Sequence, residues 1–196
     1  MLVDMFKEVD GGGYEFFQYL TKQNPALLDP MQLGTSISSY IGVGLVLLLA
    51  VLLYVLHGRT RAAQVSLAAF LFAVVLVEVL RHLVGARRPG NAEAFVDADE
   101  MTRSFPARGV FLFSLCGVLL LFAAWGALSS TWKRVLVSAN IVALILGVAF
   151  SQLVLQLHYV TDVIGGLFGG LALALLATRF FAYEREALAT ERPIRR

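Results

Sequence analysis

The sequence is poor in cysteine and in charged residues. Its single cysteine, Cys116, excludes a disulfide within the chain and a cysteine-rich metal site. Only 15% of its 196 residues are charged, against about 25% in an ordinary soluble domain, which argues against a soluble enzyme and a disordered chain. The 16 Lys and Arg and the 14 Asp and Glu are spread between apolar runs, so no basic face for binding nucleic acid is indicated.

Apolar residues make up 58% of the chain and are concentrated in five runs, each long enough to cross a bilayer. The runs cover residues 37–56, 62–84, 110–128, 135–155 and 163–181. The sequence therefore predicts an all-α polytopic membrane protein with one membrane-embedded domain, in which residues 37–181 form a five-helix transmembrane bundle. Residues 182–196 are predicted to be a basic tail.

Residues 1–36 mix aromatic and charged side chains and contain no spanning run. This pattern predicts a helix or a helix pair lying at the membrane interface, with a break at the three glycines 11–13. The Asn-Pro pair at 24–25 and the Asp-Pro pair at 29–30 are expected to turn the chain toward the first span. The polar start does not have the pattern of a cleaved signal peptide.

Lys and Arg near the span ends predict the orientation, because they are retained on the cytoplasmic side. With five spans, the short basic turns at 59–61 and 133–134 share one side with the basic tail. The long loop at 86–109 lies on the other side and carries four carboxylates as well as arginines. We therefore expect the long loop to be extracytoplasmic and the C-terminus to be cytoplasmic.

Charged side chains at the ends of spans are costly and are candidates for function. Glu78, Arg81 and His82 share one helical face at the end of the second run. His158 and Asp162 stand four residues apart at the start of the fifth run. The carboxylate can hold one imidazole nitrogen and leave the other as a nucleophile or base.

Each of these patterns has a structural alternative. His158 and Asp162 can form a simple hydrogen bond at a helix end. Glu78 and Arg81 can form a buried ion pair between helices. The arginines at 87–88 can be interfacial cations that reach toward lipid headgroups.

Glycines in the fifth run have a spacing that is typical of close helix packing. They are Gly165, Gly166, Gly169 and Gly170. Small residues four positions apart let two helix backbones approach each other in a membrane. We expect these glycines to pack the fifth span against a neighbouring helix.

Three motifs occur in order along the chain: Arg81-x6-Arg88-Pro89, Ser104-Phe105-Pro106 and Ser151-x6-His158-x3-Asp162. Their order and positions at span ends resemble the signature of the type-2 phosphatidic acid phosphatase family, which includes lipid phosphate phosphatases and haloperoxidase-like proteins. The family motifs read Lys-x6-Arg-Pro, Pro-Ser-Gly-His and Ser-Arg-x5-His-x3-Asp. The resemblance implies a helical membrane bundle whose motifs converge on one phosphate.

The resemblance also implies a role for each matching residue. Arg81, which replaces the family's Lys, and Arg88 would bind phosphate. His158 would be the nucleophile that forms a phosphohistidine, and Asp162 would orient it. Arg108, where the family has Gly, could supply a further phosphate-binding cation, with an interfacial arginine as the alternative. The resemblance implies no metal and no cofactor.

The second and third motifs depart from the family pattern. Pro106-Ala107-Arg108-Gly109 lacks the hydroxyl donor and the general-acid histidine of Pro-Ser-Gly-His. Gln152 stands where the family has a phosphate-binding Arg. Losing a general acid typically removes about 10²–10⁴-fold of the rate. The sequence therefore resembles that of a degenerate member of the family.

Two functions of different classes remain. The first is a membrane phosphatase that transfers a phosphoryl group from a phospholipid or polyprenyl phosphate to His158 and then to water, with diphosphates favoured. The second is a catalytically impaired member that binds phosphorylated lipid or serves as a subunit of a homo- or hetero-oligomeric membrane complex. A lipid or ion carrier is disfavoured because the chain has no internal repeats.

Overall fold

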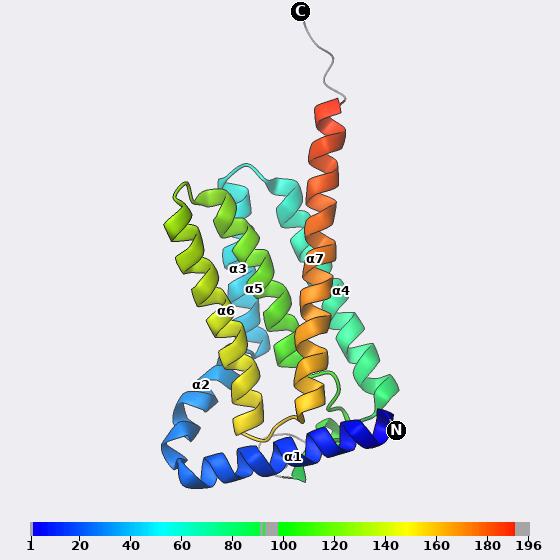
Figure 1. Cartoon of the computed structure of the whole chain (residues 1–196). Coiled ribbons are helices and arrows are strands. Elements are labelled where there is room, and N and C mark those ends of the chain that lie inside the picture. Colours follow the sequence, from blue (N-terminus) through cyan, green and yellow to red (C-terminus); the bar gives the residue numbers. More distant parts are fainter. Residues whose placement is uncertain (1, 91, 93–97, 191–196) are drawn as a thin grey trace, which may run out of the picture.

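The computed structural model describes residues 2–90, 92 and 98–190, which form helices joined mainly by short connections (Figure 1). No β-strand occurs within these described ranges, so the all-helical prediction is confirmed. The helices are α1 (Leu2–Gln23), η1 (Pro25–Leu27), α2 (Leu28–Ile37), α3 (Tyr40–Leu56), α4 (Thr60–Val84), η3 (Ala98–Thr102), α5 (Arg108–Ala127), α6 (Thr131–Val154) and α7 (Val160–Thr190), where η marks a 3-10 helix.

Among the described residues, four helices are long and apolar enough to cross a membrane, namely α4, α5, α6 and α7. The segments Pro25–Ile37 and Tyr40–Leu56 pass the same test together, with a bend of 59° between them, and give a fifth span if they are counted as one. The predicted spans therefore correspond to helices, with shifted ends. α7 continues to Thr190 through part of the predicted tail, whose residues 191–196 lie outside the described ranges.

The first predicted span is interrupted at its start. Ile37 ends α2, and α3 begins at Tyr40 rather than at residue 37. Ser39 has an extended backbone, and its side chain accepts a hydrogen bond from the backbone N–H of Gly42 at 3.3 Å. This N-cap starts a new helix and produces the bend. The expected turn at 29–30 is absent, because Pro30 lies in the first turn of α2, where a missing N–H costs little.

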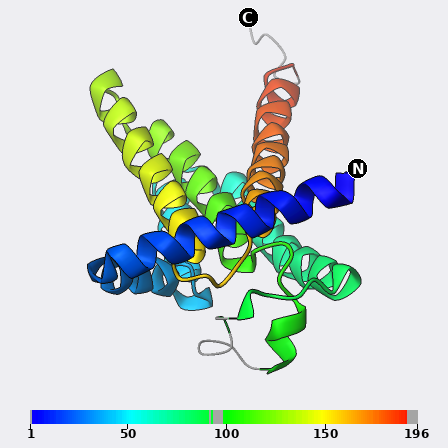
Figure 2. The ribbon, with the colours of Figure 1, turned by 60° about the horizontal axis from the view of Figure 1, so that its bottom comes forward.

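Helix α1 lies across the ends of the bundle helices (Figure 2). It runs unbroken through residues 11–13, so the predicted break at the glycines is wrong. Its contacts with α7 give the physical reason. Asp10 accepts hydrogen bonds from the backbone N–H and the hydroxyl of Thr161 at 2.9 and 2.7 Å. A Cβ on Gly13 would stand 2.4 Å from Val160 Cγ2, so glycine permits this approach, and packing offsets its low helix propensity.

Helix α5 is the central helix of the bundle. Its residues 110–119 are all buried, as expected for a helix that is apolar on every side and surrounded by others. A Cβ on Gly170 of α7 would lie 2.2 Å from the backbone oxygen of Phe111, and one on Gly166 would lie 2.7 Å from that of Ala107. The predicted packing role of these glycines is confirmed. This contact holds the start of α7 beside the start of α5, where two of the motifs meet.

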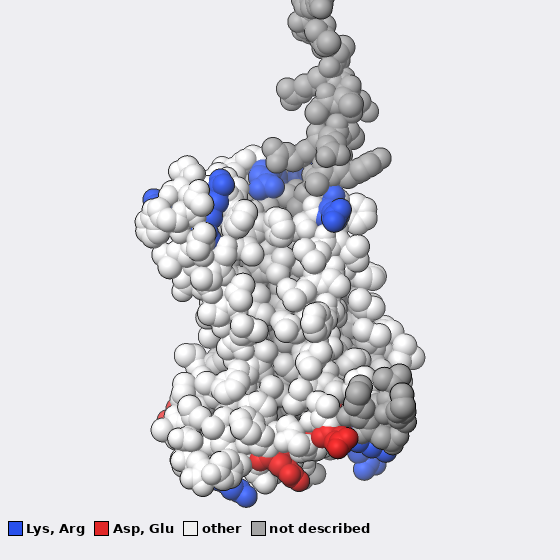
Figure 3. Space-filling model, in the orientation of Figure 1, with Lys and Arg blue, Asp and Glu red and all other residues white. Residues whose placement is uncertain are grey.

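The outer surface of the bundle keeps large apolar side chains exposed, for example Leu45, Leu71, Leu146 and Phe168. Figure 3 shows a broad band without charge, bounded by Lys and Arg at one end and by residues of both signs at the end that carries α1. An apolar surface between two charged ends is the arrangement expected for a membrane protein.

Candidate functional site

The polar residues of the three motifs come together at the end of the bundle that α1 covers. Helix α4 ends at Val84, and Gly85 after it has a φ of +58°, the left-handed conformation common after a helix. The chain then folds back, with the backbone N–H of Arg88 bonded to the Met101 oxygen at 2.9 Å and that of Ser104 bonded to the Ala86 oxygen at 2.8 Å. These bonds hold η3 beside the segment that follows α4.

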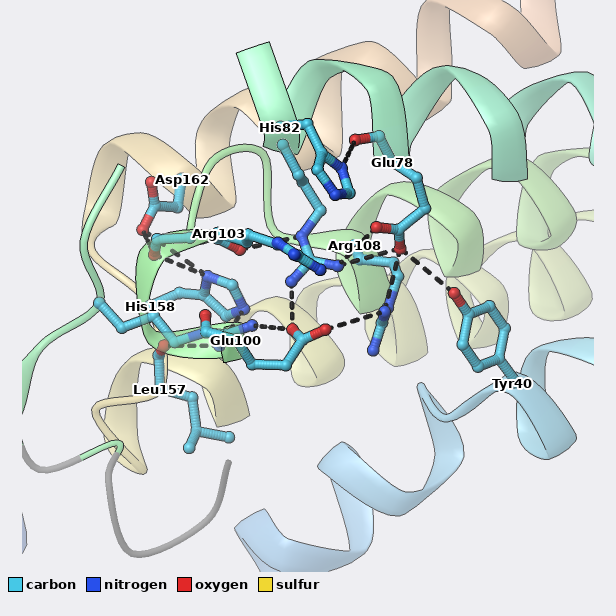
Figure 4. A network of polar contacts seen from close by, with 12 residues as sticks. Tyr40, Glu78, His82, Glu100, Arg103, Arg108, Leu157, His158 and Asp162 are labelled. Carbon is cyan, nitrogen blue, oxygen red and sulfur yellow. Dashed lines mark hydrogen bonds and ion pairs between the residues drawn. The ribbon is translucent and has the colours of Figure 1, made fainter. Parts of the chain in front are cut away.

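His158 lies in the connection between α6 and α7 and is 6% exposed. Its Nε2 is 2.9 Å from Nη1 of Arg88, and its Nδ1 is 3.2 Å from Oγ of Ser104 (Figure 4). An arginine side chain only donates hydrogen bonds. Nε2 of His158 therefore carries a lone pair, and Nδ1 carries the ring proton.

Ser104 links His158 to Asp162. The Ser104 hydroxyl donates to Oδ2 of Asp162, which also accepts from the backbone N–H of Tyr159 at 2.9 Å. The direct distance from His158 Nδ1 to Asp162 Oδ2 is 3.6 Å, longer than either of the two hydrogen bonds that connect them through the serine. The chain of donors thus runs from imidazole to hydroxyl to carboxylate and fixes the orientation of the ring.

The charge state of His158 follows from its surroundings. Burial, together with the positive charge of Arg88, outweighs the favourable interaction with Asp162 and lowers the pKa of His158 to about 4. The imidazole is therefore neutral at neutral pH. A neutral ring with a lone pair on Nε2 has the protonation state that a nucleophile needs.

Arg81 is fully buried at the end of α4. Its Nη1 donates to Glu78 Oε1 at 2.9 Å, and its Nη2 donates to the carboxylate of Glu100. Its Nε donates to the backbone oxygen of Arg103 at 2.9 Å. Arg81 is thus held by partners on its own helix, on η3 and on the loop that follows.

Arg88 is held by η3 and by the connection that carries His158. Its Nε donates to the backbone oxygen of Glu100 at 2.9 Å, and its Nη1 donates to that of Leu157 at 3.0 Å. Burial and the neighbouring charge of Arg81 lower the pKa of Arg88 to about 10. The side chain therefore stays protonated at neutral pH.

Arg108 begins α5 and turns toward the other arginines. Its Nη1 donates to Glu78 Oε1 at 3.0 Å. Its guanidinium carbon lies 4.7 Å from the centre of the Tyr40 ring, within the range of a cation–π contact. The hydroxyl of Tyr40 in turn donates to Glu78 at 3.3 Å, so α3 also supports this corner of the site.

A cavity of about 470 Å³ lies beside this network. Its wall includes Arg88, Arg108 and His158, whereas Arg81 and Asp162 lie behind these residues and do not line it. The predicted set is thus brought together, with three members at the cavity and two in support. The roles assigned to these residues remain predictions.

Two other charged candidates lie apart from the cavity. Arg87 is exposed and lines a separate, mainly apolar cavity of about 950 Å³ beside α1. His82 is exposed, and its Nδ1 donates to the backbone oxygen of Glu78 at 2.8 Å. The side chain of His82 thus meets the network at the backbone of Glu78, and neither His82 nor Arg87 lines the cavity beside His158.

Ser38, at the bend between α2 and α3, lies beside two of the positions that depart from the family pattern, Gly109 and Gln152. A Cβ on Gly109 would lie 3.0 Å from Oγ of Ser38 and 3.2 Å from its backbone oxygen. The side-chain amide of Gln152 donates to the same Oγ at 3.2 Å. The bend therefore narrows the space that a histidine at 109 or an arginine at 152 would need.

Several residues of this site were missed from the sequence. Ser104 was recognised as part of a motif but was given no role, and Glu100, Tyr40 and Ser38 were not singled out. Glu100 lies in the only long charged loop, 12 residues after Arg88, and this was the signal available for it. Tyr40 and Ser38 come from the first span, which carried no motif.

Within the described part of the chain, no three His, Cys, Asp or Glu side chains are grouped as metal ligands. Comparisons with curated proteins and with solved structures found no significant match. A family model, that of the PAP2 superfamily, matches residues 62–186, which is more than half of the chain. The matched segment contains all three motifs, together with α5, α6 and most of α4 and α7. The chain therefore belongs to the PAP2 superfamily.

Proposed function

We propose that this protein is a membrane phosphatase that hydrolyses lipid phosphates, with His158 as the nucleophile and lipid diphosphates as the preferred substrates. The single observation that carries the proposal is the arrangement of His158. Its Nδ1 is held through Ser104 by Asp162, and its Nε2 keeps a lone pair beside a cavity lined by Arg88 and Arg108. Membership of the PAP2 superfamily supports phosphatase chemistry on lipid phosphates.

In the proposed first step, Nε2 of His158 attacks the terminal phosphorus. A P–N bond forms, the P–O bond to the leaving group breaks, and the leaving oxygen takes the electron pair. The arginines offset the negative charge of the phosphoryl oxygens. Water then attacks the phosphorus, the P–N bond breaks, and inorganic phosphate leaves while Nε2 regains its lone pair.

The preference for diphosphates follows from the leaving group. A lipid monophosphate expels an alkoxide, which needs a proton as the P–O bond breaks, and Gly109 supplies no acid at the family's histidine position. A lipid diphosphate expels a phosphate monoester, which is a much weaker base and can be stabilised by arginine without proton transfer. A diphosphate can therefore react in a site that lacks the general acid.

The test compares initial rates on a polyprenyl diphosphate and on its monophosphate, at equal lipid fraction in detergent micelles. We expect the diphosphate to react at least about tenfold faster, with activity abolished in His158→Gln. Equal or faster hydrolysis of the monophosphate would overturn the preference for diphosphates. Full activity in His158→Gln would overturn the role of the nucleophile.

A second function, binding of a phosphorylated lipid without turnover, is favoured by one observation. Gly109 supplies no acid at the family's histidine position, and a Cβ there would lie only 3.0 Å from Oγ of Ser38. Native mass spectrometry of the purified protein distinguishes the two functions. Intact lipid diphosphate that stays bound over hours favours binding, whereas its conversion to monophosphate favours the enzyme.

We also propose that the site faces the extracytoplasmic side. Cys116 is fully buried, so cysteines introduced at exposed positions can be labelled selectively. We expect an impermeant maleimide to label Arg87→Cys in intact cells and Lys133→Cys only after lysis. Both residues are exposed. Arg87 follows α4 and Lys133 lies in the first turn of α6, at opposite ends of the bundle. The reverse labelling pattern would overturn the orientation.

A further inference from the structure

The carboxylate of Glu100 lies between the three arginines of the site (Figure 4). One oxygen, Oε2, accepts from Nη2 of Arg81 and is 3.4 Å from Nη2 of Arg88. The other oxygen, Oε1, is 3.7 Å from Nη1 of Arg108. No other carboxylate among the described side chains contacts all three arginines.

We propose that Glu100 is an internal anion that occupies the phosphate position and that a phosphoryl group must displace it to bind. This inference rests on the proposed function, because it takes the three arginines as the groups that bind the substrate phosphate. A carboxylate and a phosphoryl group present similar pairs of oxygens to guanidinium groups. Glu100 thus determines which anions gain enough from the arginines to enter.

The charge on Glu100 makes it an effective competitor. Partial burial acts to raise the pKa of Glu100, but the hydrogen bond from Arg81 and the charges of Arg81, Arg108 and Arg88 outweigh it and keep the pKa below its usual value. The side chain is therefore ionised at neutral pH. Any incoming anion must replace its contacts with the arginines.

The charges at the site indicate which anions can displace Glu100. Three arginines face two carboxylates, Glu78 and Glu100, so one positive charge is in excess while Glu100 is in place. Removing Glu100 from the arginines leaves an excess of two. A terminal phosphoryl group with two negative charges matches this excess, whereas a phosphodiester with one merely replaces the charge of the carboxylate.

The side chain of Glu100 can leave without unfolding the site. It is 26% exposed, so rotation can bring the carboxylate into solvent. The backbone of η3 stays tied to Arg88 through the bonds to the Glu100 and Met101 oxygens. The displaced contact also frees Nη2 of Arg88, and Nη1 can then move from His158 Nε2 to a phosphoryl oxygen. Displacement of Glu100 is thereby coupled to exposure of the nucleophile.

The test measures binding of inorganic pyrophosphate to the full-length protein in detergent, by calorimetry, without any turnover. We expect Glu100→Gln to bind pyrophosphate about tenfold more tightly than the parent, because the competing charge is gone. Glu100→Asp keeps the charge on a shorter side chain and should bind with intermediate affinity. Glu8→Gln removes the same charge at an exposed position on α1 and should leave the affinity for pyrophosphate unchanged.

The direction in which Glu100→Gln changes the affinity for pyrophosphate distinguishes an internal anion from a residue that only positions the arginines. If Glu100 only positions the arginines, Glu100→Gln would bind pyrophosphate equally or more weakly, which overturns the inference and leaves the proposed function standing. If neither the parent nor Glu100→Gln binds pyrophosphate, the arginines do not form a phosphate site, and both proposals fail. Binding that is measurable only in Glu100→Gln supports the inference.

Discussion

Nη1 of Arg88 donates a hydrogen bond to Nε2 of His158 over 2.9 Å. This nitrogen is the one that would attack phosphorus, so its lone pair is engaged in the structure without a substrate. The same guanidinium contacts the backbone oxygens of Leu157 and Glu100. Binding of a phosphate must therefore change the contacts of Arg88 before His158 can react.

The protonation of His158 gives a prediction about stability. The pKa of this histidine is about 4 in the folded protein, against 6.5 for an ordinary histidine. Between these values the unfolded chain binds a proton that the folded chain does not. The free energy of unfolding contributed by His158 is therefore fully present above pH 6.5 and decreases as the pH falls toward 4.

The measurement is denaturant-induced unfolding in detergent across this pH range. The His158→Gln variant should show a shallower decrease of stability at acid pH than the parent. His57→Gln, at an exposed position on the opposite end of the bundle, serves as the control and should follow the parent. Identical slopes in His158→Gln and in the parent would contradict the shifted pKa.

The Ser104 hydroxyl is predicted to act through His158. Ser104→Ala removes the link from Nδ1 to Asp162 and leaves the direct distance of 3.6 Å. We expect kcat to fall about tenfold to hundredfold, as for the loss of a hydrogen bond to a charged group, with KM nearly unchanged. Ser151→Ala is the matched control, because that hydroxyl is also buried but donates to the backbone oxygen of Val148, at 2.7 Å, within its own helix. Equal effects of the two changes on kcat would show that Ser104 has only a structural role.

The contact between α5 and α7 gives a prediction about packing. A methyl group at Gly170 would meet the backbone oxygen of Phe111, which cannot rotate away. Gly170→Ala should lower the free energy of unfolding by about 1–3 kcal/mol. Gly147→Ala, on α6 with no atom within 4 Å of the added Cβ, should be neutral or slightly stabilising. Unfolding curves that coincide for the two variants would contradict the close packing.

Restoring the family motifs gives a fourth prediction. The triple variant Gly109→His, Ala107→Ser and Gln152→Arg should raise activity on a lipid monophosphate, because it returns the general acid and a phosphate-binding cation. The increase should be larger when Ser38→Gly is added, since this change removes the Oγ and Cβ that crowd position 109. Equal rates with and without Ser38→Gly would mean that the bend between α2 and α3 does not limit the site.

The fold could be predicted largely because lipid imposes a simple rule. Long apolar runs must become helices, and the runs predicted from the sequence correspond to α3 through α7. The helix through the glycines at 11–13 could not be predicted, because its stability comes from Asp10 and from packing on α7. Local propensity alone favours a break there.

For a similar reason, only some residues of the candidate site could be predicted from the sequence. His158, Asp162, Arg81 and Arg88 stand at fixed spacings in two motifs, and the ends of their helices bring them together. Glu100 has no spacing relation to any of them, and its place among the arginines depends on the path of the long loop. The contacts of Ser38 likewise arise from a bend that hydropathy does not reveal.

Covalent labelling of His158 is the direct test of its proposed role as the nucleophile. The protein is mixed with a lipid diphosphate carrying a labelled terminal phosphate, quenched in alkali within milliseconds to seconds, and analysed by mass spectrometry. We expect an acid-labile phosphate on His158, absent in His158→Gln and more abundant than in Ser104→Ala at the same early time. Hydrolysis of the diphosphate with no phosphate on His158 at any time would contradict this role.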